Sequence, residues 1–127
     1  MKKVKIKLWK KRYFVEVRLF PTKKDIQKAT KDKKAAGLYH PQPYSVYPRL
    51  KIPLKLGTIY LCQERLGVGY ISHEVLHCVM DYAHKVITGN TGSFDFENND
   101  DEEEMCLQHG YIVKEICNWL YKIKIWV

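Results

Sequence analysis

The sequence lacks a long apolar segment. No apolar run in its 127 residues approaches the roughly 20 residues that a membrane-spanning helix needs. The N-terminus is basic, but lysines alternate with the apolar residues between Val4 and Leu8, so no apolar core of a signal peptide forms there. We therefore expect a cytoplasmic protein without membrane contact.

Cysteine pairs with metal-ligand or redox spacing are also missing. The four cysteines are Cys62, Cys78, Cys106 and Cys117, and no two of them form a C-x-x-C pair. Cys62 falls in a strand-like apolar pattern, whereas Cys106 and Cys117 fall in a helical one. These patterns predict buried, reduced thiols rather than a disulfide framework, and no spacing supports a cysteine metal ligand.

Acidic residues are scarce in the first half of the chain. Residues 1–55 contain 17 Lys and Arg but 3 Asp and Glu, whereas residues 56–127 contain 5 and 11. Such a basic half is either a solvated lysine surface or a contact for nucleic acid or an acidic partner, whose affinity falls with salt. Because no nucleic-acid-binding motif accompanies the charge, the solvated surface is the simpler interpretation.

The composition fits a single domain, residues 1–127, of the α+β class. Hydrophobic residues make up 46% of the chain, which is enough for a core. Residues 3–9 and 13–20 have the composition and alternation of strands, and we expect a hairpin to join them. Thr22, with Asp25 three residues later, predicts the start of a lysine-rich helix over residues 25–36, which Gly37 ends.

The middle of the chain combines prolines with a strong strand pattern. Four of the five prolines lie between residues 38 and 53, which predicts an irregular or edge-strand region that either lines a cleft or wraps the sheet. Thr58–Cys62 has the composition of a buried strand. If this strand lies at an edge, it can hold a peptide substrate by adding it to the sheet.

The most informative pattern lies in residues 71–79. His73, Glu74 and His77 form the sequence H-E-x-x-H. On a helix, residues four apart lie on the same face, so the two imidazoles can bind one metal ion. Glu74 is rotated away from His73 but remains close enough to act as the general base toward a water molecule at a zinc ion.

An apolar stripe predicts that this segment is helical. Its members recur at three- and four-residue steps: Val68, Ile71, Val75, Val79, Tyr82 and Val86. Gly67 and Gly69 precede the helix, and Gly89 with Asn90 is a suitable C-terminal stop. The two histidines lie at the edge of the stripe rather than at its centre.

A second predicted helix, residues 102–122, carries acidic residues that can supply a third ligand. Its apolar stripe consists of Cys106, Val113, Ile116, Cys117 and Leu120. Glu102 and Glu103 border this stripe, whereas Glu104 projects further away. The alternative is that these carboxylates stabilise the positive end of the helix dipole. The residues before this helix, 89–101, read as a flexible acidic connector.

The motif and the downstream glutamate resemble the gluzincin zinc metallopeptidases, in particular small phage-type zincins of the ImmA/IrrE and minigluzincin kinds. The resemblance covers residues 57–122 and includes Glu103-Glu104-Met105-Cys106, which is similar to the E-x-x-A segment with cysteine in place of alanine. It implies a zincin-like fold, bound Zn²⁺, and Glu103 as third ligand, with Glu102 and Glu104 as alternatives.

Two features depart from that family. The aspartate that often follows the ligand glutamate by four residues is Leu107 here, so Asp81, one turn after His77, is the candidate to orient a histidine. No clear donor for the tetrahedral oxyanion is present, and His84, His109 and Tyr111 are the candidates. The metzincin pattern is excluded, because it needs glycine and histidine where Met80 and Ala83 stand.

The sequence thus predicts a zinc metallopeptidase in which His73, His77 and Glu103 hold the metal and Glu74 is the base for hydrolysis of a peptide or protein substrate. It leaves open whether the enzyme is latent or highly selective, and which oligomeric state it adopts. The alternative is a non-enzymatic phage-type protein that binds nucleic acid or a host regulator through its basic half.

Overall fold

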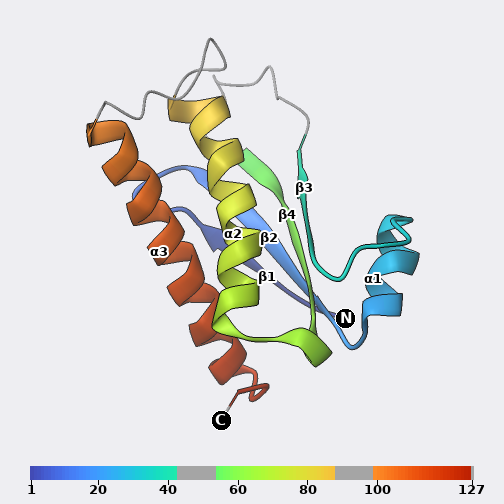
Figure 1. Ribbon diagram of the computed structural model, residues 1–127. Coiled ribbons are helices and arrows are strands. Elements are labelled where there is room, and N and C mark those ends of the chain that lie inside the picture. Colours follow the sequence, from blue (N-terminus) through green and yellow to red (C-terminus); the bar gives the residue numbers. More distant parts are fainter. Residues whose placement is uncertain (43–53, 88–98, 127) are drawn as a thin grey trace.

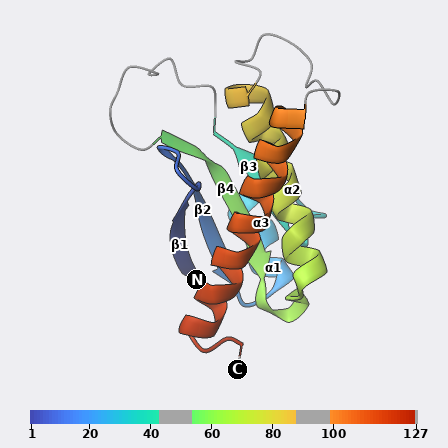
Figure 2. The ribbon, with the colours of Figure 1, turned by 90° about the vertical axis from the view of Figure 1, so that its left-hand side faces the viewer.

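A four-stranded mixed sheet forms the centre of the computed structural model, which describes residues 1–42, 54–87 and 99–126. The strand order is β1 (Lys2–Lys7), β2 (Tyr13–Phe20), β4 (Leu54–Cys62) and β3 (Leu38–Pro41). Two long helices, α2 (Val68–Tyr82) and α3 (Asn99–Lys122), cross the same face of the sheet (Figure 1). The side view shows both helices on one side of the strands (Figure 2). The chain is therefore a small α+β domain, as the composition predicts.

The first two strands form the expected hairpin. β1, Lys2–Lys7, pairs antiparallel with β2, Tyr13–Phe20, with Lys3 opposite Arg18 and Ile6 opposite Val15. The turn contains no Asn-Gly pair, and Lys10 takes the left-handed conformation there, with φ of 54°. Because side chains alternate across a strand, Ile6 and Val15 face the core while Lys3 and Arg18 face the opposite side.

Helix α1, Lys23–Thr30, is shorter than the sequence predicts. The capping box is confirmed, since Thr22 accepts from the Asp25 amide and Asp25 accepts from the Thr22 amide. The predicted extension to residue 36 is wrong, because Lys31 turns left-handed with φ of 60°. The Asp32 amide then bonds to the Thr30 hydroxyl, so a side chain replaces the next helical acceptor.

The other two strands complete the sheet. β4, Leu54–Cys62, is parallel to β2 and antiparallel to β3, Leu38–Pro41. The expected strand at residues 58–62 is confirmed. The condition that it lies at an edge is not met, because β4 has a neighbour on both sides, so it is not the strand to which a peptide can be added. Residues 56–62 are all buried, as a central strand requires. Among the described strands, β3 and β1 are the edges.

Two helices cover the sheet. The short turn η1, Gln63–Arg65, leads to α2, Val68–Tyr82, which continues into the π-helical turn η2, Ala83–Ile87. α3 spans Asn99–Lys122. The shared core consists of fully buried side chains from sheet and helices: Val15, Val17, Ile59, Leu61, Ile71, Val75, Val79, Ile112, Ile116 and Leu120.

Some side chains that the sequence predicts to be buried are exposed or half-buried. Val68, in the first turn of α2, is 59% exposed, so its assignment to the buried stripe is wrong. Cys106 is exposed rather than buried, Cys117 is half-buried, and Cys62 and Cys78 are buried as expected. All four cysteines are free thiols. The predicted stop at residues 89–90 lies outside the described residues.

A buried amide joins α3 to the β1–β2 turn. Gln108 is completely buried, accepts from the Trp9 amide at 2.9 Å and donates to the Trp9 carbonyl at 2.9 Å. It also lies 3.1 Å from the Glu104 carboxylate. The inward face of α3 therefore runs through residues 104, 108, 112 and 116, a polar start that the apolar stripe did not indicate.

None of the helices in the described parts of the chain is long and apolar enough to cross a membrane.

Candidate metal centre

The two motif histidines lie side by side on the outer surface of α2. Their Nε2 atoms are 3.3 Å apart, and the rings meet at 81° with centroids 4.9 Å apart. The His73 side chain is 67% exposed, so solvent reaches this pair. The helical spacing predicted from the sequence is confirmed, and both imidazoles point to the same place.

The separation of the nitrogens fits a shared metal ion. Two nitrogens about 2.05 Å from a zinc ion and at the tetrahedral angle lie about 3.3 Å apart. The observed 3.3 Å between His73 Nε2 and His77 Nε2 matches that value. The two imidazoles can therefore both coordinate one zinc ion without a change of the backbone.

Glu74 lies beside the pair but inside the protein surface. Its side chain is 7% exposed, and its Oε1 is 3.9 Å from His73 Nε2. Burial raises the pKa of Glu74, and the nearby charges of His73 and His77 oppose this rise. The Glu74 carboxylate thus lies next to the two imidazole rings, on the inner side of the pair.

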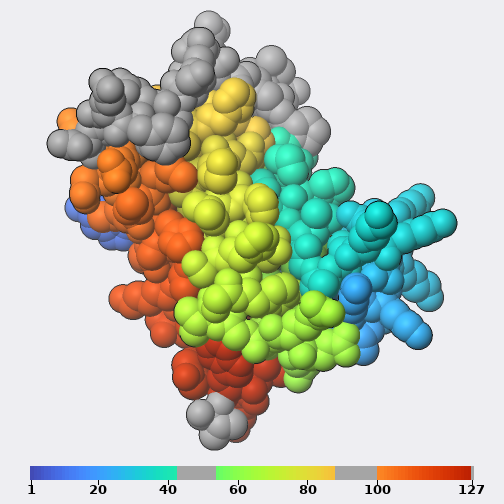
Figure 3. Space-filling view, viewed as in Figure 1, coloured from blue at the N-terminus to red at the C-terminus, as the bar shows by residue number. Residues whose placement is uncertain are grey.

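A cavity opens in front of these three side chains. Its volume is about 400 Å³, and its lining comes from α2 on one side and from the β3 region on the other: His73, Glu74, His77, Asp81, Gly37, Leu38, Tyr39 and Pro41. Figure 3 shows α2 and β3 next to each other on this face. Of the two alternatives for the proline-rich region, lining a cleft applies to Leu38, Tyr39 and Pro41 of β3.

Among the described strands, β3 pairs with β4 alone, so its other backbone edge is open beside this cavity. The Gln42 amide donates to the Leu56 carbonyl of β4, so in this register His40 and Leu38 direct their backbone groups toward β4. The amide and carbonyl of Tyr39 and the carbonyl of Pro41 therefore point away from the sheet. A strand-like ligand can bond to them.

Asp81 has other partners than a histidine. The Tyr39 hydroxyl lies 2.5 Å from its Oδ2, and Lys85 Nζ lies 2.9 Å from the same atom. Lys85 also donates to the Gln42 carbonyl at 2.6 Å. These contacts make Asp81 part of a link between α2 and β3, and not the residue that orients His73 or His77, as the sequence suggested.

The Tyr39 ring reaches Asp81 because position 57 is glycine. A Cβ atom at Gly57 would lie 2.4 Å from the Tyr39 hydroxyl and 2.6 Å from the His40 carbonyl. Tyr39 is buried, and desolvation raises its pKa well above the ordinary range, so it remains a neutral hydrogen-bond donor. Tyr39 is a site residue that the motif search missed, and its only signal was the cluster of tyrosines among prolines.

The three candidate third ligands lie on the first turns of α3. Glu102 and Glu103 are exposed. Glu104 is turned inward, where it accepts from the Tyr82 hydroxyl at 2.8 Å and lies 3.6 Å from Lys11 Nζ. The sequence placed Glu102 and Glu103 next to the buried face of α3 and Glu104 further from it. The structure shows the reverse, because the buried face passes through Gln108 and not through Cys106.

Two of the three expected metal ligands, His73 and His77, lie together, and Glu103 is not placed with them. Across residues 1–42, 54–87 and 99–126, no group of three or more His, Cys, Asp and Glu side chains is arranged to hold a metal ion. Glu103 as the third ligand stays a prediction. The zinc fit is thus partial: it depends on the imidazole pair and on Glu74.

The candidate oxyanion donors do not converge on the histidine pair. His109 Nε2 lies 3.3 Å from the Ser72 hydroxyl and 3.2 Å from the Ser72 carbonyl, which links α3 to α2. Tyr111 lines a different cavity, beside β1. His84 lies in η2, beyond the end of α2.

Comparison with protein-family models, with curated proteins and with solved structures gives no match.

Proposed function

We propose that the protein is a zinc-dependent metallopeptidase with a zincin-like arrangement of sheet and motif helix. The observation that carries the proposal is the 3.3 Å between His73 Nε2 and His77 Nε2, with the Glu74 carboxylate 3.9 Å from the first of them, at the wall of a cavity. Two imidazoles on one helix with an adjacent buried glutamate are the arrangement that metal-assisted hydrolysis needs.

Each side chain has a defined task in this proposal. A bound zinc ion would act as a Lewis acid that polarises the substrate carbonyl and makes water more acidic. His73 and His77 hold the metal, and Glu103 is the proposed third ligand. Glu74 accepts a proton from the attacking water and can return it to the leaving amine. The low exposure of Glu74 keeps its carboxylate oriented toward the pair.

The substrate is proposed to be an extended peptide segment that lies along β3. The outward amide and carbonyl of Tyr39 can form main-chain hydrogen bonds with such a segment. This places its backbone across the cavity from His73, Glu74 and His77. Pro41 has no amide, so few main-chain bonds are available, which agrees with a selective enzyme rather than a general one.

The decisive experiment compares Glu74→Gln with the wild-type protein. The zinc-loaded proteins are incubated with a diverse peptide mixture, because a selective enzyme leaves a single general substrate uncut, and products are identified by mass spectrometry. We expect the variant to retain zinc and to lose hydrolysis by at least about 100-fold, as for loss of a general base. Undiminished turnover in Glu74→Gln, or an uncleaved mixture with the zinc-loaded wild type, overturns the proposal.

A further inference from the structure

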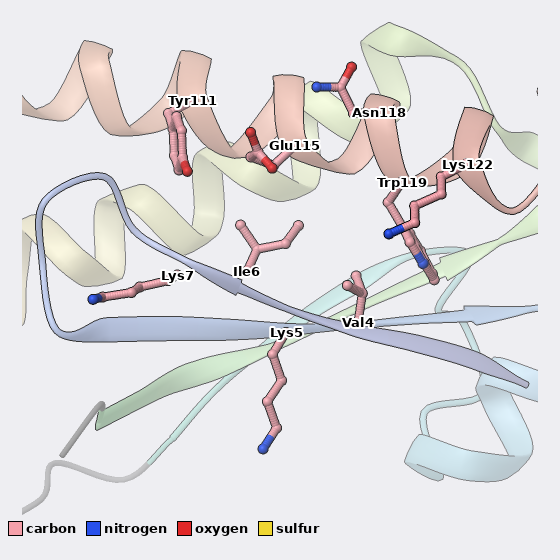
Figure 4. A pocket seen from close by; sticks show the side chains of 9 residues that line it. All are labelled: Val4, Lys5, Ile6, Lys7, Tyr111, Glu115, Asn118, Trp119 and Lys122. Carbon is pink, nitrogen blue, oxygen red and sulfur yellow. The ribbon is translucent and has the colours of Figure 1, made fainter.

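The opposite edge of the sheet has a cavity of its own, between β1 and α3. Its volume is about 250 Å³. The floor is apolar: Val4 and Ile6 point from β1 toward α3, and Trp119 points from α3 toward the strand (Figure 4). Tyr111, Glu115 and Lys122 of α3 form its polar rim. The proposed metallopeptidase site uses none of these residues.

The backbone of β1 has an open edge along this cavity. The Leu8 amide donates to the Tyr13 carbonyl, so residues 8, 6, 4 and 2 direct their backbone groups toward β2. The amides and carbonyls of Lys3, Lys5 and Lys7 therefore point outward. Among the described strands, β1 pairs with β2 alone. Outward groups of this kind are a template for another strand.

The side chains on either side of this edge have different chemistry. Val4, Ile6 and Trp119 present an apolar surface on the side of α3. Lys3 and Lys5 are exposed on the opposite side, and Figure 4 shows Lys5 directed away from α3. A strand added here would alternate between these two environments. Every second side chain would meet the apolar floor, and those between would lie beside lysines.

We propose that β1 binds an extended peptide in which apolar residues alternate with aspartate or glutamate, as a fifth strand of the sheet. The main-chain bonds come from Lys3, Lys5 and Lys7, the apolar residues lie over Ile6 and Trp119, and the acidic residues pair across strands with the lysine side chains.

The same lysines disfavour a second copy of the chain as the occupant. Pairing of two β1 strands would place lysines beside lysines, and like charges opposite one another destabilise a sheet. Reversed charge on the incoming strand turns this repulsion into attraction. Arg18, opposite Lys3 on β2, is paired with Glu16, so the positive charge at this edge comes mainly from the lysines of β1.

The first test uses a short synthetic peptide that alternates glutamate and valine, and a matched peptide that alternates lysine and valine. Amide signals of the full-length, isotope-labelled protein are followed by NMR during titration. We expect the amides of Lys3, Lys5 and Lys7 to shift and to become protected from exchange with the acidic peptide, while that of Tyr39 in β3 does not change. Equal binding of both peptides, or shifts confined to other residues, overturns the proposal.

A second test separates strand addition from simple charge attraction. Two versions of the acidic peptide carry backbone N-methyl groups, one on all glutamates and the other on all valines. In a strand only one of these two sets faces β1, so one version should lose binding and the other should retain it. Equal affinity of the two versions contradicts a strand, because a flexible charged chain does not distinguish its two edges.

Charge-reversal variants test the lysine contribution. Lys5→Glu should lower the affinity for the acidic peptide about five- to tenfold, since one favourable cross-strand pair becomes a repulsive one. Lys24→Glu on α1 makes the same change in net charge at another exposed lysine and should leave affinity nearly unchanged. Equal effects of the two variants overturn the proposal.

Two further outcomes assign the edge to another occupant and also overturn it. One is binding of an oligothymidylate strand without binding of the acidic peptide. The other is a change of the Lys3, Lys5 and Lys7 amide signals with protein concentration alone, as a second copy would cause. Binding of the acidic peptide by Glu74→Gln protein separates this site from the proposed hydrolysis.

Discussion

The two edges of the sheet, β3 and β1, differ in length, charge and covering helix. β3 has four residues, contains no lysine, and faces a cavity that α2 lines with two imidazoles and two carboxylates. β1 has six residues, four of them lysine, and faces a cavity whose α3 side carries Trp119, Tyr111 and Glu115. The same backbone feature, an open strand edge, thus occurs with two sets of side chains.

This difference shows how each edge is kept from indiscriminate pairing. At β3, Pro41 removes one outward amide and Asp81 ties Tyr39 to α2, which shortens the surface available. At β1, alternating lysines repel other basic strands and accept acidic ones. Strand pairing is restricted by geometry at β3 and by charge at β1. This is why we propose peptide hydrolysis at β3 and binding of an acidic peptide at β1.

The largest expected effect concerns metal at the β3 edge. His77→Ala should weaken zinc binding by at least about 100-fold, because loss of a ligand exceeds the tenfold to 100-fold effect of losing a group that orients one. Competition with a chromogenic chelator measures this affinity. His40→Ala, an exposed histidine of β3 outside the cavity lining, is the control and should bind zinc as the wild type does. Equal affinities of both variants would remove the metal from the β3 edge.

The same assay decides the third ligand. Glu103→Ala should lower zinc affinity, whereas Glu102→Ala, an exposed neighbour with the same charge, should not. A reduction in Glu102→Ala instead would transfer the assignment to Glu102. No reduction in either would exclude both, and Glu104 is already occupied by Tyr82 and Gln108.

The next largest effect is a loss of stability at the β1 edge that leaves β3 unchanged. Gln108→Leu removes both bonds to the Trp9 backbone and leaves that amide and carbonyl without their partner. We expect a loss of about 2–3 kcal/mol in the free energy of unfolding, measured with urea. Asn118→Leu, an exposed amide on the same helix, should change stability by less than about 0.5 kcal/mol. A stable Gln108→Leu protein would show that the β1–β2 turn does not depend on α3.

A smaller effect loosens the β3 edge and spares β1. Tyr39→Phe removes the hydroxyl that lies 2.5 Å from Asp81 and 3.0 Å from the Leu56 carbonyl. Lys85 still pairs with Asp81, so we expect a loss of about 1–2 kcal/mol. Hydrogen exchange of the β3 amides should accelerate while that of β1 does not. Tyr121→Phe, at a tyrosine that is 54% exposed, serves as the control.

The sequence predicted the parts of the fold that local patterns determine. Alternation in residues 13–20 predicted β2 with its observed bounds, and the Thr22–Asp25 pair predicted the start of α1. The H-E-x-x-H spacing placed His73 beside His77 and Glu74 next to them, which the geometry confirms. Each of these results depends on residues within one turn or one strand.

The sequence did not predict contacts between elements that are far apart in the chain. Strand composition did not show that β4 lies between β2 and β3, because a buried strand and an edge strand can share an apolar pattern. The orientation of α3 was missed because Gln108, a polar residue, occupies the centre of its inward face and pairs with a residue 99 positions away. Tyr39 was missed because it lies in β3, a strand that is too short to predict.

The smallest effect lies on the sheet face between the two edges. Glu16 of β2 is buried, which by itself would raise its pKa, but the hydrogen bond from Arg18 at 2.5 Å and the charge of Lys55 at 3.5 Å lower it. A lowered pKa means that the pairing stabilises the fold above the unfolded value of about 4.3 and is lost as pH falls through the folded value. Glu16→Gln should therefore cost about 0.5–1 kcal/mol at pH 7, and the difference from wild type should shrink as the pH falls below the unfolded value and through the lowered folded pKa of Glu16.

Glu16→Gln also tests the charge argument for β1. Removing this carboxylate, which lies opposite Lys5 in the register, leaves the lysine face more positive. The acidic peptide should then bind slightly more tightly at low salt, although the fold is less stable, and the gain should fade as salt screens it. A stability difference that stays constant between pH 7 and pH 3 would contradict the pairing. Unchanged peptide affinity at low salt would contradict a role for charge at this edge, because a neutral template responds to backbone geometry alone.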